Sequence, residues 1–290
     1  MEMKTTVLVD TLRFPESPRW HENELWFCDM FASRVMRVDL QGWVQTVVEL
    51  PDTPTAIGWN MEGHLLVVSA YARRLLRLEG ERLVEVADLS GLVTYPLNDM
   101  VINTQGRIYI GNLGYDFGDE QSIPQLAPIV LVMPDGSARI TADGLAFPNG
   151  MAITPDGQTL LVAESHGACL TAFTIDNDGS LSNRRLWAKF DAIESVGSSD
   201  NQVTPDGICL DAEGALWVAS PNTKEVLRVR EGAQITHRIR LDTIPLACML
   251  GGMGRRTLFI PTTDSLDPND TQAKGRIEIV DVDVPGAGLP

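Results

Sequence analysis

Short apolar segments recur along the chain, and no long segment shows helical periodicity. Six of these segments follow a turn rich in glycine or polar residues: ELWFCDM, HLLVVSA, RIYIGNL, TLLVAES, ALWVASP and TLFIPTT. One further apolar run precedes each turn, and another follows each segment, so a unit of about 40 to 57 residues occurs six times. Repeats of this length made of short strands are typical of β-propeller blades. A β-sandwich would show evenly spaced strands without this internal repeat.

The two ends of the chain complete the repeat pattern. A strand-like segment at residues 4–10 precedes the first unit, and another at 275–284 ends the last one. We expect the N-terminal strand to pair in the last blade, because an open ring would leave a sheet edge unpaired. The sequence therefore predicts an all-β fold: a single six-bladed propeller domain over residues 1–290, with four-stranded antiparallel blades.

The first hairpin turn of each unit provides a common register. The turn positions are Glu24, Gly63, Gly106, Gly157, Gly214 and Gly254, and eight residues before them stand Glu16, Thr55, Asn98, Asn149, Asp206 and Leu246. In a propeller this position precedes the innermost strand, at one mouth of the central channel. Side chains from different blades should therefore converge there.

This register separates similar dipeptides. Asn149-Gly150 and Asp156-Gly157 are both typical hairpin turns, yet they lie only seven residues apart. Asp156-Gly157 is in the turn register, whereas Asn149-Gly150 lies at a strand start facing the axis. Asp206 belongs to a Pro-Asp-Gly segment, but the turn of its unit is the Ala-Glu-Gly segment at 212–214. Turn chemistry therefore explains neither Asn149 nor Asp206.

The converging side chains are chemically suited to a metal ion. Glu16, Asn98, Asn149 and Asp206 would bring two carboxylates and two carboxamides together, which is costly unless a cation compensates. A ligand set made only of oxygen favours Ca²⁺, with Mg²⁺, Mn²⁺, Zn²⁺ and Fe²⁺ as alternatives. Four protein ligands would leave positions for water and substrate. Two simpler interpretations are an ion that only stiffens the ring, or a hydrated channel without an ion.

Bulk properties exclude several function classes. The formal net charge of −16 argues against nucleic acid or an anionic membrane surface as a partner. No apolar run reaches the roughly 18 residues of a membrane span, and the N-terminus lacks the apolar stretch of a signal peptide. The four cysteines are scattered in apolar runs, so we expect reduced, buried thiols in a cytoplasmic protein. We also expect the protein to be a monomer or a weak homodimer. No GxSxG motif supports a serine hydrolase.

Four segments, taken in order, carry a resemblance to a known family: PESPRWHENELWFCD, LNDMVINTQGRIYIGN, PNGMAITPDGQTLLVAES and TPDGICLDAEGALWVAS. Over essentially its whole length the chain resembles the family of senescence marker protein (regucalcin), gluconolactonase and luciferin-regenerating enzyme. That family consists of six-bladed propellers with one divalent metal on the axis. The resemblance implies that Glu16, Asn149 and Asp206 bind the metal and that Asn98 binds metal or substrate.

The resemblance also implies a reaction. Asp206 would be the general base in lactone or ester hydrolysis, or the nucleophile of the family's phosphotriesterases. Because binding a metal weakens a carboxylate as a base, hydroxide on the metal is an alternative nucleophile. Organophosphate-ester hydrolysis and calcium or ligand binding without turnover are the alternative functions.

The substrate contacts expected from the sequence are Asn98, Asp99, Asp116, Tyr95 and Phe147. Sugar-lactone members carry an arginine where this chain has Pro96, and the surrounding residues Phe14, Leu97, Met100 and Phe117 are apolar. A lactone or ester less polar than a sugar lactone is therefore the expected substrate. Segments 114–128, 191–202 and 264–275 are expected to be loops that act as lids.

Overall fold

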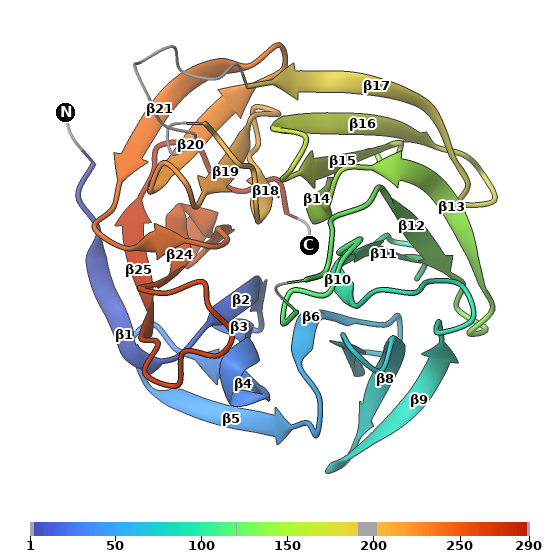
Figure 1. Cartoon of the computed structure of the whole chain (residues 1–290). Coiled ribbons are helices and arrows are strands. Elements are labelled where there is room, and N and C mark those ends of the chain that lie inside the picture. The colour runs from blue at the N-terminus through green and yellow to red at the C-terminus, as the bar shows by residue number, and fades with distance from the viewer. Residues whose placement is uncertain (1–2, 120, 191–201, 289–290) are drawn as a thin grey trace.

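The protein is built almost entirely of β-strands, arranged as six small sheets around a central axis (Figure 1). The computed structural model describes residues 3–119, 121–190 and 202–288. Within these ranges it has 25 strands and two single-turn 3₁₀-helices, η1 (Met30–Ala32) and η3 (Met253–Arg255). The predicted six-bladed propeller is confirmed.

Each of the first five blades is a four-stranded antiparallel sheet whose strands follow one another in chain order. The first blade has β2 (Pro15–His21), β3 (Glu24–Asp29), β4 (Arg34–Val38) and β5 (Val44–Glu49). The second has β6 (Pro54–Trp59), β7 (Leu65–Ser69), β8 (Arg74–Glu79) and β9 (Arg82–Asp88). The third has β10 (Leu97–Ile102), β11 (Ile108–Asn112), β12 (Ala127–Val132) and β13 (Ala138–Leu145). The fourth has β14 (Pro148–Ile153), β15 (Thr159–Glu164), β16 (Cys169–Ile175) and β17 (Leu181–Lys189). The fifth has β18 (Ile208–Leu210), β19 (Leu216–Ser220), β20 (Glu225–Arg230) and β21 (Gln234–Arg240).

The sixth blade joins the two ends of the chain. Its strands are β22 (Ile244–Pro245), β23 (Met249–Gly251), β24 (Thr257–Thr263), β25 (Gly275–Asp281) and β1 (Thr6–Leu12). β22 and β23 both pair with β24 and share the innermost position, while β1 pairs antiparallel with β25. The expected closure by the N-terminal strand is confirmed, and the strand begins two residues later than the sequence pattern suggests.

The two turn-like dipeptides of the fourth blade have different structures. Gly157 closes the turn between β14 and β15: its N–H donates to the Thr154 carbonyl at 2.8 Å, and its φ of +71° suits a glycine. Asn149 and Gly150 instead lie inside β14. Both dipeptides therefore lie where the repeat register predicts.

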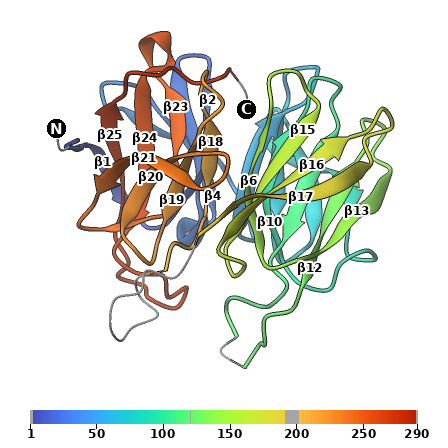
Figure 2. The same cartoon turned by 90° about the horizontal axis from the view of Figure 1, so that it is seen from above.

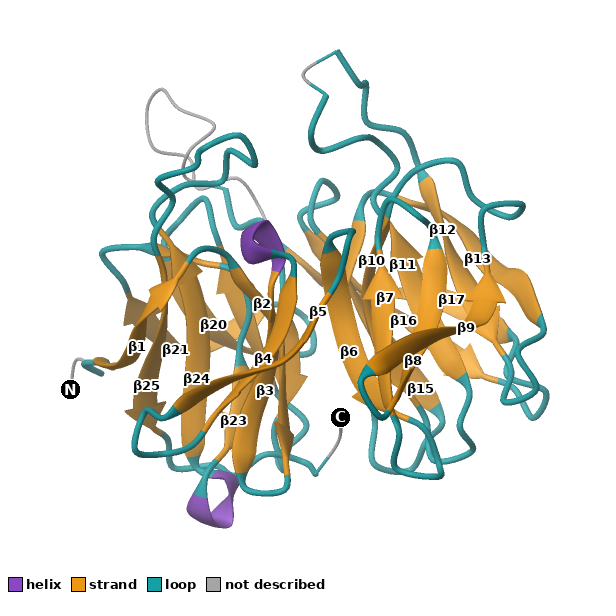
Figure 3. Ribbon diagram, turned by 90° about the horizontal axis from the view of Figure 1, so that it is seen from below, coloured by secondary structure: helices purple, strands orange, loops and turns teal. Residues whose placement is uncertain are grey.

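The strands present two different ends. Figure 3 shows η1 and the long loops at one end, and η3 and the C-terminus at the other. Figure 2 shows the same separation from the opposite side. The loops between β11 and β12 and between β24 and β25 contain most of predicted segments 114–128 and 264–275. Residues 191–201 of the third predicted loop lie outside the described part of the chain.

Apolar side chains fill the spaces between neighbouring blades. One cluster joins Phe27 of the first blade, Trp217 of the fifth and Phe259 of the sixth, all almost fully buried. The four cysteines are buried and form no disulfide, as expected. Among the described residues no helix has the length and apolar character needed to cross a bilayer.

Candidate metal and substrate site

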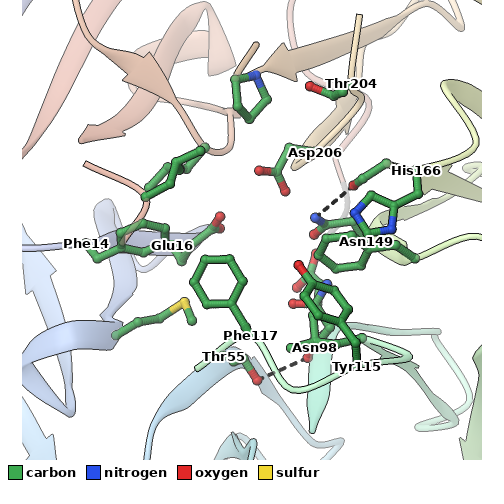
Figure 4. A pocket seen from close by; sticks show the side chains of 18 of the residues that line it. Phe14, Glu16, Thr55, Asn98, Tyr115, Phe117, Asn149, His166, Thr204 and Asp206 are labelled. Atoms are coloured by element: carbon green, nitrogen blue, oxygen red, sulfur yellow. Dashed lines mark hydrogen bonds between the residues drawn. The ribbon is translucent and has the colours of Figure 1, made fainter. Parts of the chain in front are cut away.

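The register positions of all six blades meet at one cavity. The cavity has a volume of about 300 Å³, and its lining includes Glu16, Thr55, Asn98, Asn149, Asp206 and Leu246. Glu16, Asn98 and Asn149 lie near the starts of β2, β10 and β14, and Asp206 lies two residues before β18. Figure 4 shows the four oxygen-bearing side chains pointing from separate blades into a shared space. The structure thus brings the predicted ligand set together.

Local irregularities of the strands aim these side chains. Pairing shifts register between Glu16 and Arg19, between Leu97 and Met100, and between Pro148 and Met151. Such irregularities bend a strand and redirect a side chain. At the ends of the innermost strands, the blades also approach closely. An ideal Cβ on Gly150 would lie 2.6 Å from the Asp206 carbonyl oxygen, so the glycine after Asn149 is required by the next blade.

The two carboxamides are held by their nitrogen atoms. Asn98 Nδ2 donates to the Pro148 carbonyl at 3.2 Å. Asn149 Nδ2 donates to Ser165 Oγ at 3.1 Å, and this hydroxyl donates to the Pro205 carbonyl at 2.8 Å. Because the protein binds one N–H of each amide and so sets the orientation of the group, the amide oxygens are presented as acceptors. Carboxamide oxygens in this orientation suit a hard cation.

The two axial carboxylates are strongly perturbed. Burial raises the pKa of Glu16 to about 8, with the negative charge of Asp99 adding to it and the Ser17 N–H opposing it. Burial also raises the pKa of Asp206 well above its usual value, and the charges of Glu16 and Asp99 act in the same direction. Asp206 Oδ1 is buried without a hydrogen-bond partner in the described structure. An unpaired carboxylate oxygen beside another acid is the arrangement that a cation would relieve.

A third carboxylate already has its counter-charge. Arg19 Nη2 contacts Asp99 Oδ1 at 2.8 Å and donates to the Met100 carbonyl at 2.6 Å; this Asp99 oxygen also accepts from Ser17 Oγ at 3.1 Å. Both side chains are largely buried. Three carboxylates and one guanidinium leave the centre with a formal charge of −2, which equals the charge that a divalent ion neutralises.

The donor set is unusual in composition. Among the described residues, no group of three or more histidine, cysteine or acidic side chains is arranged to hold a metal. A cation at the axis would therefore depend on the two carboxamides as well as Glu16 and Asp206. Four neutral or anionic oxygens are typical ligands of Ca²⁺ and are poorly suited to soft metals. The residues present fit a hard divalent ion.

Aromatic side chains form much of the cavity wall. Tyr115, Phe147 and His166 form a cluster with ring centroids 4.8–5.6 Å apart, and Phe14 stacks on Phe31 at 4.2 Å. Burial lowers the pKa of His166, which favours its neutral form. Of the described residues, no lysine or arginine lines the cavity. The walls therefore suit an uncharged, partly apolar ligand.

Not every expected substrate contact lies at this cavity. Asn98, Asp99 and Phe147 line it, whereas Tyr95 and Asp116 are not part of the described lining. Asp116 Oδ1 accepts from the Gly118 N–H at 2.9 Å, and the Tyr95 hydroxyl accepts from Gln125 Nε2 at 3.1 Å. Leu97 and Met100 are fully buried in a core cluster instead of lining the site.

Sequence reasoning missed several lining residues, among them Ser165, His166, Thr204 and Asn222. His166 lies in the turn after β15 and is exposed over part of its surface, but it also lines the cavity. Ser165 ends the apolar run TLLVAES, and Thr204 lies two residues before Asp206. A register count from the second strand of each blade would have identified Ser165.

Comparisons with known proteins agree with this geometry. The model of a family described as "SMP-30/Gluconolactonase/LRE-like region" matches residues 14–264. The chain is 26% identical to 6-deoxy-6-sulfogluconolactonase of Pseudomonas putida over 95% of its length and 93% of that protein. It is 26% identical to human regucalcin over 97% of its length and 95% of that protein. A solved luciferin-regenerating enzyme has the same fold, with a TM-score of 0.81, 17% identity and coverage of 98% and 97% of the two chains.

Proposed function

The chain belongs to the SMP-30/gluconolactonase/LRE-like family, and from this premise we propose that it is a hydrolase that opens a lactone, or a related ester, at a divalent cation held on the propeller axis. One observation carries the proposal. Four oxygen-bearing side chains from four blades face one cavity, and one of their carboxylate oxygens, Asp206 Oδ1, is buried without a partner.

The cation would be held by Glu16, Asn98, Asn149 and Asp206. Calcium is the first choice because all four donors are oxygens and the centre has a formal charge of −2. When bound, the ion would supply a Lewis acid that polarises the ester carbonyl and stabilises negative charge on its oxygen.

The chain's own residues would supply the proton transfer and the positioning. Asp206 lines the cavity, and its Oδ1 makes no hydrogen bond within the described structure, so this carboxylate could accept a proton from water as the water attacks the carbonyl carbon. Ser165 fixes the Asn149 amide, and Arg19 holds Asp99 in an ion pair. A substrate that fills the aromatic-walled cavity would exclude bulk water from this centre, which would strengthen the electrostatic interactions inside it.

The substrate we propose is uncharged and less polar than a sugar lactone. Neither a lysine nor an arginine of the described chain lines the cavity, so an anionic group would find no cationic partner there. The family's sugar-lactone arginine is replaced by Pro96, and the walls are aromatic. The same observations allow an uncharged organophosphate ester as a second candidate substrate.

The test is a panel of lactones and esters, from glucono-δ-lactone to alkyl lactones and a neutral phosphotriester. Each would be assayed by pH indicator in the presence of chelator and after reloading with Ca²⁺, Mg²⁺, Mn²⁺ or Zn²⁺. Turnover that a chelator removes and one of these ions restores would support the proposal. Calcium binding without turnover of any compound would contradict it and favour a binding protein, while turnover of only the phosphotriester would favour the second candidate.

A further inference from the structure

A second, smaller cavity adjoins the axial cavity. Its volume is about 190 Å³, and Met30, Thr55, Leu113 and Phe117 line both spaces. None of the carboxylates that line the axial cavity lines this second cavity. It is bounded by Tyr71 and Pro96 of the second blade and the segment after it, and by Pro268 of the loop between β24 and β25. We call it the side pocket.

Phe117 stands between the two cavities. It contributes to both linings, and Figure 4 shows its ring reaching into the axial space. Its loop makes several internal contacts: the Asp116 N–H donates to Ser122 Oγ at 2.8 Å, and the Gln125 N–H donates to the Gly114 carbonyl at 3.0 Å. These contacts hold the loop that carries Phe117, and its ring borders both cavities as a partition between them.

Asp116 and Tyr71 support this partition from the side. Burial, followed by the negative charge of Asp116, raises the pKa of Tyr71 to about 12. The Tyr71 hydroxyl also packs against the loop backbone, since an ideal Cβ on Gly118 would lie 3.3 Å from it. Asp116 thus connects the loop to the second blade, which explains why it lies outside the axial lining.

The side pocket has the chemistry of a site for an apolar group. No charged side chain of the described chain lines it, and its walls are mostly aromatic, aliphatic or proline. At ~30 Å³ for each water-sized group, its volume accepts an apolar group of roughly four to six carbon atoms. A pocket that continues from a reactive centre in this way usually determines specificity.

We propose that the side pocket is a substrate subsite, which binds an uncharged alkyl or aryl substituent of the molecule whose reactive ring lies at the axis. The inference rests on the proposed function for the identity of the reactive ring. Phe117 lines this subsite as well as the axial cavity, so its ring limits the volume available to the substituent. Pro96 forms part of the wall of this subsite.

The first experiment measures kcat/KM for δ-lactones with unbranched alkyl chains of zero to eight carbons next to the ring oxygen. For the calcium-loaded wild type we expect kcat/KM to rise by about threefold to fourfold for each CH₂ group and to level off near four to six carbons. A lactone whose chain ends in a carboxylate should lose this gain. A flat or falling profile for the wild type would overturn the proposal.

Two variants that fill the pocket and one that enlarges it assign the effect to this pocket. Thr53 and Pro268 line the side pocket but not the axial cavity, so Thr53→Trp should remove the dependence on chain length while leaving the unsubstituted lactone within about twofold. Pro268→Trp fills the pocket from the loop between β24 and β25, so it tests the same point if Thr53→Trp folds poorly. Phe117→Ala should move the plateau to longer chains. Leu126→Ala, an exposed position in the same loop, is the control and should match the wild type.

A binding measurement separates failure of this inference from failure of the proposed function. If the wild type turns over no lactone, calorimetry with the corresponding alkyl δ-lactams, which resist hydrolysis, still tests the pocket. Affinity that rises with chain length in the wild type and not in Thr53→Trp supports the subsite. Equal affinity for all lactams, or a slope that survives both filling variants, overturns it.

Discussion

The same tripeptide, Pro-Asp-Gly, has opposite environments at residues 155–157 and 205–207. Asp156 is exposed in the turn between β14 and β15, where Oδ1 accepts from Thr154 Oγ1 at 2.6 Å and from the Gln158 N–H at 3.0 Å. Those hydrogen bonds lower its pKa. Asp206 lies at the axis with Oδ1 unpartnered in the described structure, and burial raises its pKa. Identical local sequence therefore yields either a solvated turn acid or a buried acid at the axis.

The two glycines differ for the same reason. Gly157 has a φ of +71°, and an added Cβ would meet nothing within 4 Å. At Gly207 an ideal Cβ would lie 2.3 Å from the Cβ of Ala247 in the sixth blade. The first glycine is needed for a backbone conformation and the second for close approach of two blades. Position within the repeat, and not the tripeptide itself, decides the role of each residue.

The largest effect should come from the aspartates. Asp206→Asn removes the proposed base and should lower kcat/KM for the best lactone by about 10³-fold, because general-base catalysis contributes on the order of 10²–10⁴-fold. Asp156→Asn should change it by less than about twofold. Initial rates measured with saturating calcium test both variants, and calorimetry should show that Asp206→Asn still binds the ion. Full activity of Asp206→Asn would show that another group takes the proton.

The glycines should differ in stability. Gly207→Ala forces the inner strands of the fifth and sixth blades apart and should cost about 3 kcal/mol or more in the free energy of unfolding. Gly157→Ala places alanine at a positive φ and should cost about 1 kcal/mol. Urea unfolding monitored by tryptophan fluorescence would compare the two. Similar losses would mean that the blades adjust at Gly207 and that the close approach is not required.

Counting along the repeats predicted more of this molecule than its motifs did. The eight-residue offset from each first turn identified six positions that line one cavity, including the apolar Leu246. That success has a physical cause: blades of one architecture place equivalent residues at equivalent distances from the axis. The same reasoning placed the N-terminal strand in the last blade.

The remaining features depend on contacts that no periodic count contains. Arg19 of the first blade neutralises Asp99 of the third, and only the closed ring brings them together. The sequence predicts that Asp116 contacts the substrate. In the structure its loop places it beside Tyr71 instead, and the position of Asp116 in the repeat does not contain this information. The side pocket arises where two loops of unequal length meet the blades, and loop lengths vary independently of the repeat.

The opposite pKa shifts predict a pH dependence for the ion-free protein. The pKa of Glu16 is about 8 when folded, against a usual value of 4.5. A raised folded pKa means that the folded protein binds the extra proton, so stability falls as pH rises from about 4.5 to about 8. Between pH 5 and 7 this amounts to roughly 2 to 3 kcal/mol. Asp206 acts in the same direction, whereas Asp156, with its lowered pKa, does not.

Thermal or urea unfolding in chelator at several pH values would measure this loss. Saturating calcium should reduce it, because the ion stabilises the charged carboxylates and releases their protons on binding. Glu16→Gln removes one of the two titrating groups and should flatten the profile in chelator. A wild-type profile in chelator that matches that of Glu16→Gln would contradict the assigned shift.

The smallest effect extends the comparison from the aspartates to Asn149. Ser165 Oγ accepts from Asn149 Nδ2 and donates to the Pro205 carbonyl, so it orients the carboxamide oxygen that would bind the proposed cation. Ser165→Ala should weaken calcium binding by about tenfold, the lower end of the effect expected for a residue that orients a ligand. Ser69→Ala is the matched control, because Ser69 is also buried, ends β7 and bonds Asp52 away from the cavity. Ser165→Ala loses two hydrogen bonds and Ser69→Ala one, each with an expected cost of about 1 kcal/mol in stability. Both variants should therefore unfold somewhat more easily than the wild type, but only Ser165→Ala should weaken calcium binding in calorimetric titrations. Equal calcium affinities would mean that Asn149 needs no such support.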